Sequence, residues 1–228
     1  MTTNAALLGF NGDSWKEEVL LHDGQKIVIK RSQTYGGRSE IGQSAPIKEH
    51  NIEFTLPNTG KVIKWMSEYG EDLGRTNFNL LAVHVLNAVP YIVVEPNLCL
   101  SYNKWGRPNP PYVIFKYDAS AWQRITLQAL PAEFKTVNVV LSIWGLQVKT
   151  LVSAGFVSAE KVRELNSHLE LVQHRGILKD ELLDGNGCLV PSNAQAKLIA
   201  PELNGKPLYY NWWPLAQDWL NRTYGKNK

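Results

Sequence analysis

The chain lacks the sequence features that would assign it to most common protein classes. None of its apolar runs reaches the roughly 18 residues that a membrane-spanning helix needs, and the longest, such as 137–144, have the length of a strand. Neither GxGxxG nor GxxxxGK[ST] occurs, so the two common nucleotide-phosphate cradles are absent. There is also no GxSxG or HExxH motif. The sequence therefore predicts no transmembrane segment and carries no catalytic signature.

Cysteine and net charge are also low. The two cysteines, Cys99 and Cys188, could pair in an oxidising compartment or remain thiols in a reducing one. The net charge of +3 permits a local basic patch but is small for a nucleic-acid-binding domain. The five histidines lack metal-ligand spacing, so we expect no metal and no cofactor. The N-terminus resembles no signal peptide, which indicates either a cytoplasmic protein or one whose targeting segment is not in this sequence.

The sequence is rich in tryptophan and in turn signals. Each of the eight tryptophans needs burial for its ring and a partner for its N–H, which indicates an aromatic core or a recognition surface. Alternating apolar strands flank four turns, at 23–24, 57–60, 87–89 and 118–120. This pattern predicts antiparallel hairpins. We therefore expect a mainly β protein, an antiparallel meander folded as a barrel or sandwich. A propeller is disfavoured because it needs at least four blades of about 40 residues.

The pattern changes from strands to helices in the C-terminal third. Ser158 can cap a helix over 159–174, along which four apolar residues recur at helical spacing: Val162, Leu165, Leu169 and Val172. Near the end, Pro214 suits a first helical turn. We expect burial of at least two of the three nearby tryptophans, Trp212, Trp213 and Trp219. The chain thus divides into an antiparallel β-domain, 1–150, and a helical C-terminal extension packed on it, 151–228.

Segment 97–117 combines large aromatic and basic side chains with three prolines. Proline removes a backbone donor and fixes φ, so we expect a loop here rather than a helix or a central strand. A stiff loop that presents amphipathic side chains suits a binding surface. The candidate binding residues are Tyr102, Lys104, Trp105, Arg107 and Tyr112. The alternative is that Trp105 and Tyr112 fold back onto the core.

These residues favour binding over catalysis. Two of the many carboxylates could act as an acid–base pair, as in glycosidases, but linear sequence does not give their separation. The aromatic and basic side chains could contact a glycan or stack nucleic-acid bases, although the small net charge makes nucleic acid the weaker candidate. We therefore predict a non-catalytic binding or interaction module for a protein or glycan partner. The alternative is a hydrolase that acts on an envelope glycan through paired carboxylates.

Four segments resemble a known group of proteins: GDSWKEEVLLHDG (12–24), IGQSAPIKEH (41–50), CLSYNKWGRPNPPYVIFKY (99–117) and WQRITLQALPAEFK (122–135). From about residue 11 to about residue 140 the chain resembles uncharacterised exported or lipoprotein-like proteins of proteobacteria. The resemblance implies a periplasmic or envelope location and carries no activity or site residue. The region after about residue 175 and the lack of a signal segment depart from that pattern.

The resemblance bears on the two cysteines, because the bacterial envelope is oxidising. Both cysteines follow turn-like residues, and the chain has no others. We therefore expect a Cys99–Cys188 disulfide that links the β-domain to the C-terminal extension. The alternative is two separate thiols, with Cys99 facing the core from a strand.

Overall fold

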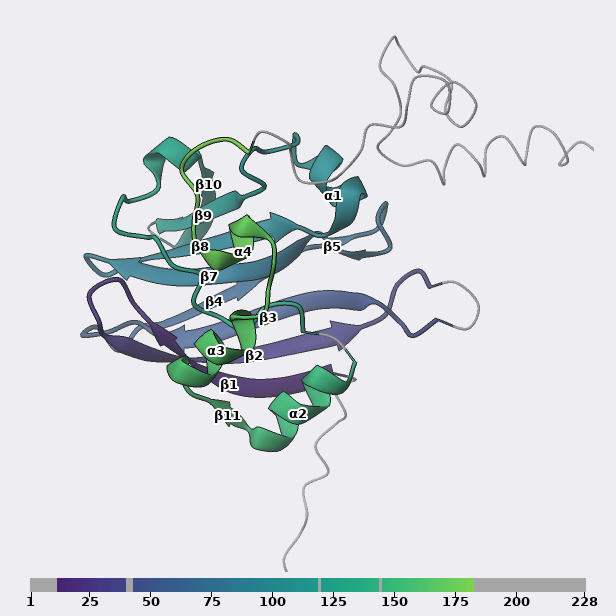
Figure 1. The fold of residues 1–228 in the computed structure, drawn as a ribbon, viewed down its shortest axis with the longest axis horizontal. Coiled ribbons are helices and arrows are strands. Elements are labelled where there is room, and N and C mark those ends of the chain that lie inside the picture. The colour runs from purple at the N-terminus through teal and green to yellow at the C-terminus, as the bar shows by residue number, and fades with distance from the viewer. Residues whose placement is uncertain (1–11, 40–42, 119, 144, 183–228) are drawn as a thin grey trace, which may run out of the picture.

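The computed structural model describes residues 12–39, 43–118, 120–143 and 145–182, and within them two sheets share one hydrophobic core (Figure 1). Their strands pair antiparallel, except that the short β11 pairs parallel with β1. The first sheet has the order β11–β1–β2–β3–β4. Its strands are β1 (Gly12–Leu20), β2 (Lys26–Tyr35), β3 (Ile47–Thr55), β4 (Val62–Met66) and β11 (Phe156–Val157). The second sheet has the order β10–β9–β8–β7. Its strands are β7 (Phe78–Leu86), β8 (Val89–Pro96), β9 (Val113–Asp118) and β10 (Ala121–Ile125).

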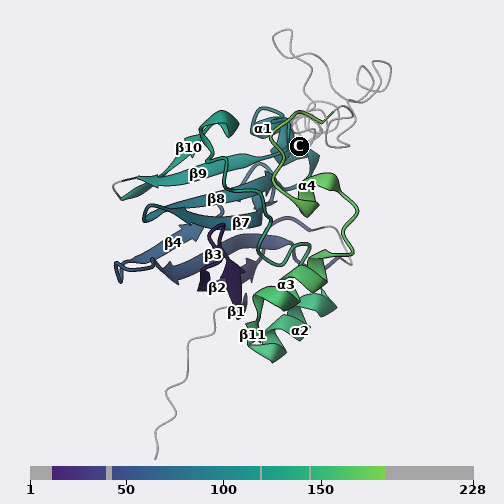
Figure 2. The ribbon, with the colours of Figure 1, turned by 60° about the vertical axis from the view of Figure 1, so that its left-hand side comes forward.

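Shorter elements complete the fold. A two-stranded ribbon, β5 (Tyr69–Gly70) with β6 (Arg75–Thr76), lies in the connection between the two sheets. The helices are α1 (Leu98–Lys104), the 3₁₀ turn η1 (Leu127–Ala129), α2 (Leu146–Ala154), α3 (Ala159–Asn166) and α4 (Val172–Arg175). Figure 2 shows α2 and α3 beside β1 and β11, at one side of the first sheet.

The mainly β, antiparallel fold class is confirmed. The predicted hairpins form as β1–β2, β3–β4, β7–β8 and β9–β10. Gly24 turns the first hairpin with a φ of 84°, a conformation that glycine adopts without strain. At the third turn Asn87 and Ala88 both have positive φ, which matches the twist of the flanking strands. Local turn chemistry therefore positions the main hairpins.

The core lies between the two sheets and extends past the second one. Alternate residues of the first sheet point inward, among them Val19, Ile29 and Ile52, which are almost fully buried. On β8, by contrast, every residue from 90 to 94 is buried. The far face of the second sheet is covered by Phe134, whose ring stacks on His84 at 4.4 Å and meets Tyr91 edge-on. Strands β7 and β8 are thus buried on both faces.

The helical region differs from the prediction in one respect. Ser158 caps α3 as expected, with its hydroxyl accepting a hydrogen bond from the Lys161 N–H. The helix ends at Asn166, however, and not near residue 174, so the prediction of one continuous helix was wrong. The Asn166 side chain bonds the backbone of segment 138–141, and a separate helix, α4, follows. The predicted burial of Trp212, Trp213 and Trp219 lies outside the described residues.

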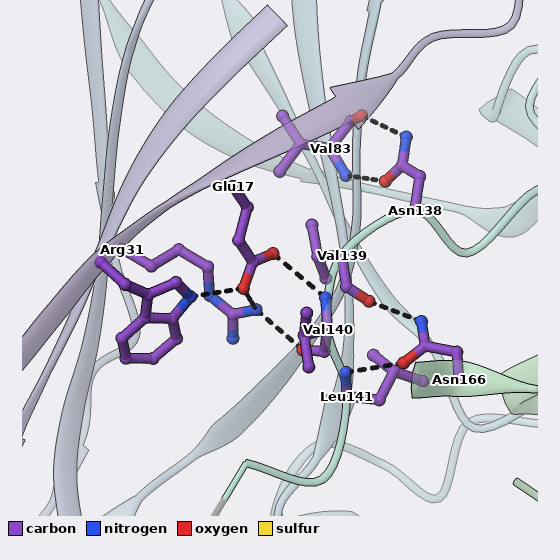
Figure 3. A network of polar contacts seen from close by, with 9 residues as sticks. Glu17, Arg31, Val83, Asn138, Val139, Val140, Leu141 and Asn166 are labelled. Atoms are coloured by element: carbon purple, nitrogen blue, oxygen red, sulfur yellow. Dashed lines mark hydrogen bonds and ion pairs between the residues drawn. The ribbon is translucent and has the colours of Figure 1, made fainter. Parts of the chain in front are cut away.

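A buried ion pair holds an extended segment against the first sheet (Figure 3). Glu17 is fully buried, and its Oε1 accepts hydrogen bonds from Arg31 at 2.9 Å and from the Trp15 indole at 2.6 Å. The other oxygen, Oε2, accepts from the Val140 N–H at 3.0 Å, while Arg31 donates to the Val140 carbonyl at 2.7 Å. The ion pair therefore supplies hydrogen-bond partners for both backbone groups of Val140, as a neighbouring strand would.

Two asparagine side chains make further hydrogen bonds of this kind between segment 138–141 and its neighbours. The Asn138 amide bonds both the N–H and the carbonyl of Val83, at 3.0 and 2.8 Å (Figure 3). The Asn166 amide bonds the Val139 carbonyl at 2.7 Å and the Leu141 N–H at 3.1 Å. Buried backbone groups need partners, and here side chains supply them. Segment 138–141 can therefore be buried without pairing as a strand.

The Glu17→Gln variant tests the energetic weight of this ion pair. It leaves a buried guanidinium without its counter-charge, so we expect a loss of about 3–5 kcal/mol in the free energy of unfolding. Urea denaturation measures the loss. Glu160→Gln is the control, because Glu160 is an exposed carboxylate that contacts Lys26, and its loss should leave stability near that of the parent. Equal effects of the two substitutions would contradict the assignment.

Two buried histidines make stability depend on pH. Burial, assisted by the charge of Arg31, lowers the pKa of His50 to about 3. Burial also lowers the pKa of His84 to about 4, against the opposing effect of its hydrogen bond to the Thr136 carbonyl. Both rings are therefore neutral in the folded protein at pH values where the unfolded chain, with a histidine pKa near 6.5, binds protons.

We expect the free energy of unfolding to fall as the pH drops from about 6.5 towards 4, because the unfolded state then binds more protons than the folded state. Each histidine contributes up to about 1.4 kcal/mol per pH unit. Urea titrations at several pH values, compared with those of His84→Phe, measure the contribution of one ring. His168→Gln, at an exposed position, is the control. An unchanged slope in His84→Phe would contradict the expectation.

Candidate functional site

A groove of about 560 Å³ lies over β2, β3 and β4 and reaches β9 and β10 of the second sheet. Its volume is within the range of small-molecule sites. We call it the β4 groove. The residues that line it are Lys30, Ser32, Asn51, Ile52, Glu53, Lys64, Trp65, Met66, Glu68, Phe78, Phe115 and Trp122. Charged, amide and aromatic side chains thus share one open depression.

The polar side of the β4 groove is built from two rows of outward-facing residues. In the first row Lys30, Glu53 and Lys64 stand directly opposite one another on β2, β3 and β4. The Glu53 carboxylate accepts a hydrogen bond from the Lys64 ammonium at 2.8 Å, and this bond holds the pKa of Glu53 below its usual range. The adjacent row runs from Ser32 through Asn51 to Met66. Strand register therefore determines which polar groups meet.

The aromatic side is fixed by contacts between the two sheets. The Trp122 indole N–H on β10 donates to the Lys64 carbonyl on β4 at 2.7 Å. The Trp122 ring also packs edge-on against Tyr117, with the ring centroids 5.1 Å apart. Deeper in the groove, Phe115 contacts Trp65 and Phe78. The half-buried Trp122 ring is therefore held in place before any ligand arrives.

The predicted binding segment differs from the expectation, because its first part is helical. α1 occupies Leu98–Lys104, so the prediction that 97–117 excludes a helix was wrong. The three prolines begin only at Pro108, and a proline restricts only itself and the residue before it, so residues 98–104 remain free to form a helix. Beyond the helix, the chain follows the proline-rich path into β9.

The candidate binding residues are distributed between the interior and the surface. Tyr102 and Tyr112 are each only 5% exposed. Burial raises the pKa of Tyr112 to about 12, and its hydroxyl lies within hydrogen-bond distance of Gln173 and Gly176 carbonyl oxygens. Trp105 is half-buried, and its ring lies 4.5 Å from that of Phe78. Trp105 and Tyr112 therefore pack as the alternative interpretation expected, and Tyr102 is buried as well.

Two of the candidates reach the surface. The Lys104 ammonium pairs with the Asp72 carboxylate at 2.8 Å. The Arg107 guanidinium lies 5.7 Å above the Tyr102 ring, and the residue is exposed. The structure thus brings Arg107 onto Tyr102 but does not assemble the five residues as one aromatic face, since Tyr112 packs towards α4 and Trp105 towards Phe78. Trp105 connects this region to the β4 groove through Phe78, which lines the groove.

The sequence alone did not identify the β4 groove. Its polar residues belong to three strands, and the Trp122–Lys64 contact joins positions 58 residues apart. The alternation of Lys30, Glu53 and Lys64 with buried neighbours was visible, but their alignment requires the strand register. Among the described residues, no group of three or more histidine, cysteine, aspartate or glutamate side chains could hold a metal ion. Along the same residues, no helix is long and apolar enough to cross a membrane.

Comparison with protein-family models, with curated proteins and with solved structures finds no match for this chain.

The predicted disulfide involves one described residue and one outside the description. Cys99 lies on α1 at an exposed position, and it is not a free thiol. The alternative, with Cys99 facing the core from a strand, was therefore wrong about its position. Cys188 lies outside the described residues, so its pairing with Cys99 stays a prediction.

We expect thiol titration of the denatured, unreduced protein to find no free thiol, and two after reduction. On the chain-entropy model, closing a loop of about 90 residues stabilises the fold by roughly 4–5 kcal/mol. Cys99→Ser and Cys188→Ser should then lower the melting temperature by the same amount, because each removes the same bond. Because Cys99 is exposed on α1, a serine in its place should leave the packing of the helix unchanged. Two free thiols before reduction would contradict the pairing.

Proposed function

We propose that the protein is a non-catalytic binding module and that the β4 groove binds a glycan. The observation that carries the proposal is the combination within one groove of an aromatic wall and two rows of hydrogen-bonding side chains. A sugar ring has an apolar face of C–H groups and a rim of hydroxyls. Aromatic rings suit the face, and amide, carboxylate and ammonium groups suit the rim.

The geometry favours a site that is formed in advance. The Trp122 ring is fixed by its hydrogen bond to the Lys64 carbonyl and by its contact with Tyr117. The Glu53 carboxylate is oriented by Lys64. Side chains that are already ordered lose little conformational entropy when a ligand binds. Such preorganisation favours the binding of a hydroxyl-rich ligand whose individual contacts with the protein are weak.

Segment 97–112 supports the groove in this proposal. Trp105 packs against Phe78 and receives the Arg124 guanidinium 5.5 Å above its ring. Since Phe78 lines the groove, Trp105 positions the groove wall from behind. Lys104 and Arg107 remain at the surface beside it.

The proposal includes an envelope location. A disulfide between Cys99 and Cys188 would persist in an oxidising compartment and not in the cytoplasm. That Cys99 is not a free thiol supports this part of the proposal. Recovery of the protein in the periplasmic fraction would test it directly.

A glycan hydrolase is the second candidate, because Glu53 and Glu68 both line the β4 groove. Glycosidases place two carboxyl groups about 5–10 Å apart across the scissile bond. The Lys64 hydrogen bond keeps Glu53 ionised, so Glu53 would be the nucleophile or base and Glu68 the acid. Binding is the better-supported function, because the Glu53 carboxylate is already paired with the Lys64 ammonium and is therefore less available to act as a nucleophile or base.

Tryptophan fluorescence, which the groove residues Trp65 and Trp122 would report, can measure the binding of defined oligosaccharides. The probes are cello-, chito- and malto-oligosaccharides and oligogalacturonates. We expect at least one to bind, and Trp122→Ala to weaken its binding by tenfold or more, because the variant removes the aromatic wall. Trp122→Phe should retain part of the affinity. The control is Phe156→Ala, at an exposed aromatic position on β11.

Two results would count against glycan binding at the groove. One is that no probe binds, and the other is that Trp122→Ala binds as tightly as the parent. Release of shorter sugars from a bound probe, lost in both Glu53→Gln and Glu68→Gln, would instead establish the hydrolase.

A further inference from the structure

Two lysines stand directly opposite each other on the solvent-facing side of the first sheet. Lys16 on β1 is the register partner of Lys30 on β2, and both side chains are exposed. Like charges in directly opposed cross-strand positions repel each other and destabilise a sheet. The pair is therefore a local cost to stability in the free protein.

The other lysines on this face have counter-charges. Lys26 contacts the carboxylates of Glu18 and Glu160, each at 2.9 Å. Lys64 pairs with Glu53. Among the described residues, by contrast, Lys16 forms no ion pair, and Lys30 stands opposite Glu53 without an ion pair to it, although, together with the Lys64 hydrogen bond, the charge of Lys30 helps to lower the pKa of Glu53. The positive charge of this sheet face is thus concentrated at the Lys16–Lys30 pair.

Neutral hydrogen-bonding groups border the lysine pair. In the adjacent row, Ser14 stands opposite Ser32, and Ser32 stands opposite Asn51. Ammonium, hydroxyl and amide groups all donate hydrogen bonds to an anion, and the ammonium bonds are the strong ones. Lys30, Ser32 and Asn51 also line the β4 groove. The cationic position and the groove are therefore continuous.

We propose, resting on the function proposed above, that the ligand of the β4 groove is an acidic glycan whose anionic group binds between Lys16 and Lys30. The aromatic wall on β10 meets the first sheet at β4, two strands away from Lys30. Two strand spacings correspond to about 10 Å. A ligand that contacts both positions therefore spans more than one sugar ring, so it is an oligosaccharide with at least one acidic unit.

The charges of the groove distinguish this ligand from a nucleic acid. A nucleic-acid strand carries a phosphate at every nucleotide. Glu53 and Glu68 both line the groove and would repel a continuous row of phosphates. One cationic position beside two carboxylates fits a polymer whose acidic groups are isolated.

The test uses the full chain and a matched pair of probes, an oligogalacturonate and the same oligomer with its carboxylates methyl-esterified. The double variant Lys16→Gln/Lys30→Gln removes the lysine pair and keeps two polar side chains. We expect it to bind the acidic oligomer at least roughly tenfold more weakly than the parent, with a smaller dependence on salt. Its affinity for the esterified oligomer should stay within about twofold.

Two controls separate the proposed contact from general effects. Lys135→Gln removes one lysine charge at an exposed position in the segment that covers the second sheet, so it should leave binding unchanged. The double variant should also be the more stable protein, with a melting temperature higher by about 1–3 °C, because the repulsion between the lysines is gone. A loss of acidic-glycan binding in a more stable variant cannot arise from unfolding.

Each remaining outcome decides between the proposals. If the parent binds both oligomers equally, glycan binding stands and the anionic contact is overturned. If neither these oligomers nor the neutral probes bind, glycan binding itself fails, and the anionic contact with it. Tighter binding of single-stranded oligothymidylate than of the oligogalacturonate would overturn the acidic glycan in favour of a nucleic acid.

Discussion

The Glu17–Arg31 ion pair is the interaction on which the rest of the fold depends. A buried charge pair is costly unless its remaining hydrogen-bonding capacity is satisfied. Here Trp15 completes one side of the carboxylate, while Val140 supplies both a donor and an acceptor. The pair therefore binds the chain segment that follows the second sheet to the inner face of the first. With Asn138 and Asn166, it replaces a missing strand by side chains.

The meeting of the two sheets at their edges determines the surface available for binding. β4 is an edge strand, and such edges need protection against pairing with other chains. Trp122 from β10 gives part of that protection, since its indole N–H occupies the Lys64 carbonyl. The same contact places an aromatic ring beside the polar rows of β2, β3 and β4. The hydrogen bond from Trp122 to Lys64 thus both protects the edge of β4 and forms part of the groove.

The hairpins and the Ser158 cap could be predicted because a few neighbouring residues determine them. Asp23-Gly24 specifies a turn locally, and the Ser158 hydroxyl bonds an N–H three residues later. The burial of Tyr112 could be stated only as one of two alternatives, since its hydroxyl meets groups more than 60 residues away. α1 was missed because the effect of the prolines was extended to residues that precede them. The β4 groove depends on register and on contacts between the sheets, which a single sequence does not contain.

The buried ion pair and the exposed lysine pair lie on the same two strands, and the register connects them. Side chains alternate between faces, so Glu17 and Arg31 point inward while their neighbours Lys16 and Lys30 point outward. If β1 slipped by one residue along β2, the outward residues of β1 would point into the core and the charge of Glu17 would be exposed. The Glu17–Arg31 pair and its contacts with Val140 therefore oppose any such slip. By holding β1 and β2 in this register, the core keeps the two lysine ammonium groups opposite each other despite their mutual repulsion.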